Sequence, residues 1–214
     1  MKTKLITSIA CLLFMAGLAF GQTQTLSLTN GGVNNVTLSS GTTSFELDVS
    51  STFSGYNSFG LSYWLQVPSA VASAFSITGV TYGATFNDGN QTTPATIPFN
   101  DSTTADGAAS GFTIETRDLG STNGSTGPGV VAGTYADTSM TINLSGLAAG
   151  TYTLESTIGG SRPSEQSDTS FTGHDFPEST FTITVVPEPA TWSLFGLGAI
   201  GAFGLNLWRT RRRA

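Results

Sequence analysis

The sequence predicts an all-β protein built around a single β-sandwich, with an additional segment at each end of the chain. Three observations support this fold class: short runs in which apolar and polar residues alternate, turn-forming Gly, Asn and Asp between the runs, and a charged fraction of only 10%. Alternation with period two buries one face of a strand and leaves the other in water, as in antiparallel sheets. Long solvated helices need more charged side chains than this chain has. An all-helical or coiled-coil protein is therefore not expected.

About eight to ten short strands are expected between the two end segments. The alternation is clearest in four runs: Phe45, Leu47, Val49; Met140, Ile142, Leu144; Tyr152, Leu154; and Phe181, Ile183, Val185. Further strands are predicted at 24–30, 33–39, 59–67, 75–86 and 111–117, where Thr, Val, Ile and aromatic residues are frequent. So many short strands in the length of one domain predict two packed sheets around one core.

The segments between these strands are expected to be turns, loops and one short helix. The alanines between Pro68 and Phe75 favour the helix. The glycines that precede Tyr152 predict a hairpin turn whose second strand starts at that tyrosine. Residues 87–110 and 117–129 consist mainly of Gly, Ser, Thr, Asn and Asp, so they are expected to be long surface loops.

The first 21 residues have the features of a secretory signal peptide. Two lysines precede an apolar run from Leu5 to Phe20, and small residues end the segment before Gln22. A retained membrane anchor is the alternative, although the apolar run is short for a span. Cleavage removes the single cysteine, Cys11. The mature chain is therefore expected to lack disulfides, a thiol nucleophile and cysteine-bound zinc.

The other end of the chain has three parts. First comes Val186-Pro187-Glu188-Pro189, in which the prolines block helix and sheet pairing and leave the segment accessible to a protease. Residues 190–208 are almost entirely apolar, and a transmembrane helix of that length would reach roughly 28 Å, enough to cross a bilayer. The last part is the basic tail with Arg209, Arg211, Arg212 and Arg213. Because arginine clusters remain cytoplasmic, residues 22–186 are expected on the far side of the membrane.

The order of these three parts resembles the PEP-CTERM sorting signal of Gram-negative bacteria that make exopolysaccharide. The resemblance covers residues 187–214. It implies that the chain is a substrate of an exosortase, a membrane enzyme that cuts near the motif, and that Pro187, Glu188 and Pro189 are recognised rather than catalytic. A plain C-terminal membrane tail is the alternative. The chain then divides into a signal peptide at 1–21, a β-sandwich passenger at 22–186 and the sorting signal at 187–214.

The charge of the predicted passenger excludes one class of partner. Residues 22–186 contain thirteen carboxylates and only two arginines, Arg117 and Arg162, which gives a formal net charge of −11. So acidic a segment is unsuited to binding the phosphates of a nucleic acid. Contact with the membrane is expected through the C-terminal helix.

The passenger has a second, weaker resemblance. From Phe45 to Tyr82 a strand, a Gly/Ser turn, an aromatic strand, a helical turn and another strand follow one another. This order is similar to cohesin-like or carbohydrate-binding-module sandwiches, including jelly rolls, of exported bacterial proteins. No sugar-binding motif of those families can be aligned, so no binding residue carries over. Tyr56, Tyr63 and Trp64 are nevertheless candidates for stacking on sugar rings if they are exposed, with packing in the core as the alternative.

The search for catalytic groups gives little. His174 is the single histidine and has Asp175 and Ser170 near it in sequence, but proximity along a loop is not the geometry of a triad, and the chain has no G-x-S-x-G elbow. A glycosidase needs two acids facing across a cleft. The chain has acids enough for such a pair, namely Glu46, Asp48, Glu115, Asp118 and Glu155, yet the wet face of a sandwich explains them more simply. No catalytic residue is therefore predicted.

Calcium is the one cofactor that the sequence suggests. Asp88, Asp101 and Asp106 lie in polar loops that offer the hard oxygen ligands calcium prefers. Their spacing does not fit an EF-hand, and acidic loops that are merely solvated are the alternative.

These observations predict an exported protein of the cell surface or exopolysaccharide matrix, sorted by an exosortase, with a structural or adhesive and non-catalytic role. Low charge and abundant Ser and Thr suit contact with a hydrated polymer such as exopolysaccharide. The alternatives are an extracellular module that binds a carbohydrate or a protein, and a secreted hydrolase.

Overall fold

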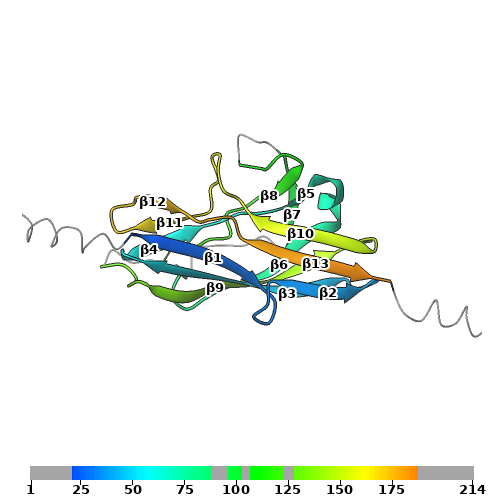
Figure 1. The fold of residues 1–214 in the computed structure, drawn as a ribbon, viewed down its shortest axis with the longest axis horizontal. Coiled ribbons are helices and arrows are strands. Elements are labelled where there is room, and N and C mark those ends of the chain that lie inside the picture. The colour runs from blue at the N-terminus through cyan, green and yellow to red at the C-terminus, as the bar shows by residue number, and fades with distance from the viewer. Residues whose placement is uncertain (1–20, 88–95, 103–106, 123–127, 188–214) are drawn as a thin grey trace, which may run out of the picture.

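The computed structural model describes residues 21–87, 96–102, 107–122 and 128–187, and over these ranges the chain forms a β-sandwich with one short 3₁₀ helix (Figure 1). The elements are β1 (Thr23–Thr29), β2 (Asn35–Ser39), β3 (Ser44–Ser54), β4 (Ser58–Ser62), β5 (Leu65–Pro68), η1 (Ser69–Ala74), β6 (Phe75–Tyr82), β7 (Ile97–Asp101), β8 (Phe112–Glu115), β9 (Gly133–Leu144), β10 (Gly150–Ser156), β11 (Glu165–Asp168), β12 (Gly173–Asp175) and β13 (Thr180–Val186). The predicted all-β sandwich is confirmed.

The first layer of the sandwich is the antiparallel sheet β1-β3-β9-β6. Its two longest strands, β3 and β9, pair through Leu47 and Met140, and through Phe45 and Ile142. These side chains are buried because they occupy the alternate positions that face the core. The alternation seen in the sequence thus corresponds to the inner face of this layer.

The second layer has the order β8-β5-β10-β13-β2. Its pairings are antiparallel, except that β2 runs parallel to β13. Strand β7 joins the two layers: Ile97 pairs with β6 of the first layer, whereas Phe99 pairs with β8 of the second. Between the layers the ring of Phe45 stacks on that of Phe181, with centroids 5.6 Å apart and an interplanar angle of 10°.

A separate three-stranded sheet, β12-β11-β4, lies at one end of the sandwich. Figure 1 shows this sheet at the end opposite to that at which β13 finishes. The predicted strand 59–67 is therefore two strands in two different sheets, β4 and β5, with a break at Tyr63 and Trp64.

The other predicted strands correspond to strands of the structure, and the predicted helix between Pro68 and Phe75 is the 3₁₀ helix η1. The predicted hairpin before Tyr152 is wrong. Although β9 and β10 are consecutive, β9 pairs with β3 and β6, whereas β10 pairs with β13 and β5. The connection crosses from one layer to the other because the apolar faces of both strands pack toward each other across the core.

The segment 87–110, predicted to be a surface loop, contains β7, whose Ile97 and Phe99 are buried in the core. In the segment 117–129 the side chain of Leu119 is also fully buried. The predicted signal peptide and the residues beyond Pro187 lie outside the described ranges, apart from Gly21. Within those ranges no helix is long and apolar enough to cross a membrane.

Candidate functional site

The last strand, β13, leads directly into the predicted sorting signal. β13 is an interior strand between β10 and β2, and its side chains Phe181, Ile183 and Val185 are buried. The carbonyl oxygen of Val186 accepts a hydrogen bond of 2.7 Å from the amide of Ser40. Pro187 follows at once, so the segment predicted to be cut begins directly at a strand of the core. Glu188, Pro189 and the four arginines of the tail lie outside the described residues.

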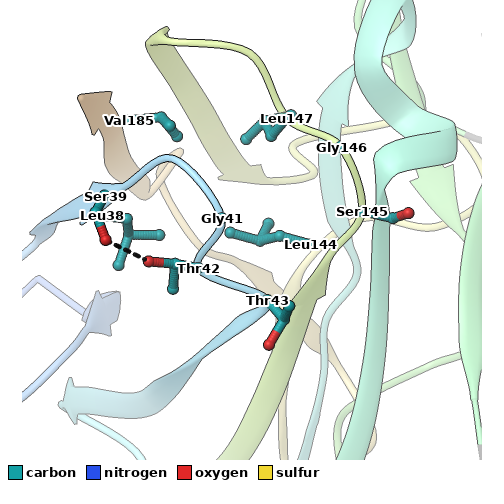
Figure 2. A pocket seen from close by; sticks show the side chains of 10 residues that line it. All are labelled: Leu38, Ser39, Gly41, Thr42, Thr43, Leu144, Ser145, Gly146, Leu147 and Val185. Carbon is teal, nitrogen blue, oxygen red and sulfur yellow. Dashed lines mark hydrogen bonds between the residues drawn. The ribbon is translucent and has the colours of Figure 1, made fainter. Parts of the chain in front are cut away.

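A hollow of about 260 Å³ opens beside this exit, between the β2–β3 turn and the β9–β10 connection (Figure 2). Leu38, Leu144, Leu147 and Val185 line its apolar side. Its polar side is formed by hydroxyl groups, and Ser39 Oγ lies 3.3 Å from Thr42 Oγ1. A second hollow of about 380 Å³ lies beside η1 and β7. No acid, histidine or arginine lines either of these two hollows, so neither presents a general acid or base.

The three predicted sugar-stacking residues have different surroundings. Tyr63 is completely buried, and its hydroxyl group bonds Thr138 Oγ1. The prediction for Tyr63 is therefore wrong, because the break between β4 and β5 turns its ring into the core. Trp64 is half-buried. The ring of Tyr56 is covered by two others, Phe53 at 5.3 Å and His174 at 4.4 Å.

His174 is part of strand β12 rather than of a loop. Its Nε2 lies 3.2 Å from Asp168 Oδ2, whereas Asp175 is its neighbour along the strand, on the opposite face. Burial and the nearby carboxylate of Asp168 raise the pKa of Tyr56, which stacks on this histidine, to about 12. His174 of the small sheet therefore packs on Tyr56, which in turn stacks on Phe53 of β3.

One aromatic pair in the small sheet was not predicted as a pair. Phe171, in the turn between β11 and β12, stacks on Phe59 of β4 with centroids 5.3 Å apart. Phe171 is far from Phe59 in sequence and is surrounded by polar residues, so alternation gave no signal for it. A phenylalanine isolated in a Ser/Thr turn was the one available hint.

The predicted calcium ligands are only partly described. Asp101, at the end of β7, forms an ion pair with Arg162, with Oδ2 and Nη1 2.8 Å apart. Asp88 and Asp106 lie outside the described residues. Among the residues that the structure describes, no group of three His, Asp or Glu side chains is placed to hold a metal ion. The calcium site remains a prediction.

The acids considered for a glycosidase pair are divided between the layers: Glu46 and Asp48 are on β3 of the first, whereas Glu115 and Glu155 are on β8 and β10 of the second. Glu46 is on the outer face of β3, where its Oε1 accepts a hydrogen bond of 2.7 Å from Ser139 Oγ. Glu115, at the end of β8, is fully buried, and burial raises its pKa well above the usual value. Asp118 accepts hydrogen bonds from Ser62 Oγ and from two backbone amides. Desolvation raises the pKa of Asp118 despite these bonds.

Another acid lies inside the first layer, at a β-bulge. Val49 of β3 pairs with Thr138 and Ser50 pairs with Ala136, so Asp137 is the extra residue of β9. Its side chain is buried, and its Oδ1 accepts a hydrogen bond of 3.1 Å from Ser51 Oγ. Burial raises the pKa of Asp137 to about 7, although bonds from Ser51 act in the opposite direction.

Together, the fold and the C-terminal segment define an exported all-β sandwich protein. Residues 185–213 match the model of the PEP-CTERM protein-sorting motif. The motif indicates that the chain is exported, is membrane-anchored before it is sorted to the cell surface, and is processed by an exosortase. The predicted sorting signal is thus confirmed. No curated protein has a sequence that matches this chain.

Solved structures with a similar course of the chain include three cohesins. The third cohesin ScaC of Acetivibrio cellulolyticus, in complex with the ScaB dockerin, is 8% identical with a TM-score of 0.46, covering 77% of this chain and 99% of that one. A chain of a type I cohesin–dockerin complex from Clostridium thermocellum is 9% identical with a TM-score of 0.45, covering 77% and 99%. The seventh ScaB type I cohesin of Pseudobacteroides cellulosolvens is 13% identical with a TM-score of 0.44, covering 77% and 93%. The likeness concerns the course of the chain alone.

Proposed function

We propose that this chain is a non-catalytic protein of the cell surface or exopolysaccharide matrix, which an exosortase delivers there as a folded β-sandwich. Its role is structural or adhesive. The observation that carries the proposal is the junction at Val186 and Pro187: the last core strand passes directly into the sorting motif. Cutting beyond Pro187 would release the described sandwich with all of its strands.

The non-catalytic part of the proposal is supported by the placement of the acids. Glu115 and Asp137 are buried in different layers, and the two described hollows are lined by apolar, hydroxyl, glycine and amide groups. A hydrolase needs a base and an acid that reach the same substrate atom. The buried acids and the uncharged linings of the hollows instead suit a scaffold whose surface is rich in hydroxyl groups.

The intact mass of the protein from surface and medium fractions tests the proposal, in host cells with and without the exosortase. We expect loss of residues 1–21 and of the chain beyond about residue 188, the latter only when the enzyme is present. A protein that keeps Trp192 to Ala214 in both strains would overturn the proposal, because it would be an ordinary single-span membrane protein.

Glu188→Ala tests which residues the enzyme recognises. The substitution removes the acid between the two prolines, so we expect the uncut precursor to accumulate at least tenfold in the membrane fraction. Thr191→Ala, two residues beyond Pro189 but within the same matched segment, is the matched control and should be processed like the wild type. Both variants keep every residue of the sandwich, so their melting temperatures should agree. Normal processing of Glu188→Ala would show that Pro187 and Pro189 suffice.

A further inference from the structure

The turn between β11 and β12 belongs to the small sheet, which lies at the end of the molecule opposite to the one at which β13 finishes (Figure 1). The side chain of Phe171 is 81% exposed. Its ring rests on Phe59, with an interplanar angle of 30°. Phe59 is itself half-buried, so the two rings together form a supported, flat apolar face that a ligand can cover.

The backbone of Phe171 is held in a conformation that its side chain disfavours. Its φ angle is +59°, and within the described ranges it is the one residue other than glycine with a positive φ. Glycine or asparagine would adopt this left-handed conformation at lower cost. A bulky residue kept there against its preference points to a function of the ring that outweighs the strain.

Asp168 fixes this conformation. Its Oδ1 accepts hydrogen bonds from the amides of Ser170, at 2.7 Å, and Thr172, at 3.0 Å. Its Oδ2 lies 3.2 Å from His174 Nε2. The bond from the amide of Thr172 is the main reason why the pKa of Asp168 is lowered. Because the turn is tied down on both sides of Phe171, little conformational freedom is lost when a ligand covers the ring.

The chemistry around the ring selects one class of partner. A flat aromatic face packs well on the C–H face of a sugar ring, while hydroxyl groups such as those of Ser170 and Thr172 can bond sugar hydroxyls. Glu165 and Asp175 face each other as a cross-strand pair in the same small sheet, and the passenger as a whole carries a net charge of −11. An acidic polymer or an anionic membrane would be repelled.

We propose that Phe171, supported by Phe59, is a stacking site for a neutral polysaccharide. The site rests on the proposed function, since it gives the adhesive role a contact surface and a ligand class. The placement agrees with this role: β13 finishes at one end of the sandwich, whereas the small sheet that carries the exposed ring lies at the other (Figure 1).

Electrophoresis of the protein from the surface fraction, in native gels containing dextran, galactomannan or hydroxyethylcellulose, tests the site. We expect retardation in at least one of these gels and none in alginate. Phe171→Asn should lower the association constant at least tenfold and leave the melting temperature equal or higher, because asparagine tolerates the backbone angle. Phe171→Tyr should keep binding. Val33→Ala, which alters an exposed apolar side chain in another turn, should bind like the wild type.

Several outcomes would overturn the proposal that Phe171 stacks on a neutral polysaccharide. Passage of the wild type through all three neutral gels without retardation would do so, and so would wild-type binding by Phe171→Asn or by Phe59→Ala. Retardation by alginate alone would assign an acidic ligand instead. A concentration-dependent dimer in sedimentation that Phe171→Asn abolishes would assign the ring to self-association. Each of these results would leave processing by the exosortase, and with it the proposed function, intact.

Discussion

Asp137→Asn is expected to remove a large pH dependence of stability. In the folded protein burial raises the pKa of Asp137 to about 7, whereas in the unfolded chain its value is near 3.8. Between these two values the unfolded state has lost the proton and the folded state keeps it. The free energy of unfolding therefore falls as the pH rises from about 4 to about 7, by up to about 4 kcal/mol, and levels off above.

Urea unfolding of the surface-fraction protein at several pH values from 4 to 8 measures this effect. At pH 4 the wild type and Asp137→Asn should be nearly equal in stability, because a neutral acid and an amide have similar shape. At pH 8 the variant should be the more stable, by up to about 4 kcal/mol. Ser51→Ala removes the hydrogen bond to Oδ1, so the pKa of Asp137 should rise further and the decline should continue to higher pH. Parallel curves for the wild type and Asp137→Asn would show that this carboxyl is not the source.

Other buried acids should also make the free energy of unfolding fall as the pH rises. Desolvation also raises the pKa values of Glu115 and Asp118. For such acids stability is greatest at low pH and is lost as the pH rises toward the folded pKa. A protein whose interior acids are neutral tolerates acid better than one held by ion pairs. The described part of this chain has few ion pairs, among them Arg162 with Asp101, so acid has few such pairs to break.

The layers of the fold could be predicted because their signal is local. From Phe45 to Val49 of β3, from Met140 to Leu144 of β9 and along β13, each second residue is apolar and buried, so period two alone located these strands. The same signal does not say which strands are neighbours, and for that reason β9 and β10 were wrongly joined in a hairpin. Strand β11, Glu165–Asp168, has no apolar residue. It is held by backbone pairing with β4 and β12, which depends on residues far away in sequence.

The candidate sites, like the strands, could be predicted only where their signal is local in the sequence. The sorting motif is contiguous, so Pro187 to Arg213 could be identified from order and composition alone. Whether Tyr63 is exposed depends on the break between β4 and β5, which a continuous run of apolar residues concealed. The aromatic pair forms only when Phe59 of β4 and Phe171 of the strained β11–β12 turn are brought together by the fold. Contacts of this kind arise from tertiary structure and leave no periodic pattern.

Phe181→Ala is expected to destabilise the sandwich by about 3–5 kcal/mol, because it leaves a cavity where the two layers meet. The ring is fully buried and stacks on Phe45. Phe181→Leu keeps most of the volume and should cost clearly less. Val131→Ala, at a side chain that is 64% exposed, should change the free energy of unfolding by no more than about 0.5 kcal/mol. Chemical denaturation of the three variants measures the differences.

This substitution also separates the stability of the passenger from its sorting. Phe181 is in the strand that leads into the motif, yet it lies six residues before Pro187. We expect Phe181→Ala to be cut at the normal position but to reach the surface in smaller amount, because a less stable domain is unfolded and degraded more often. Glu188→Ala should do the reverse and leave a stable, uncut precursor. If Phe181→Ala instead blocked cutting, the exosortase would have to recognise the folded end of β13 as well as the motif.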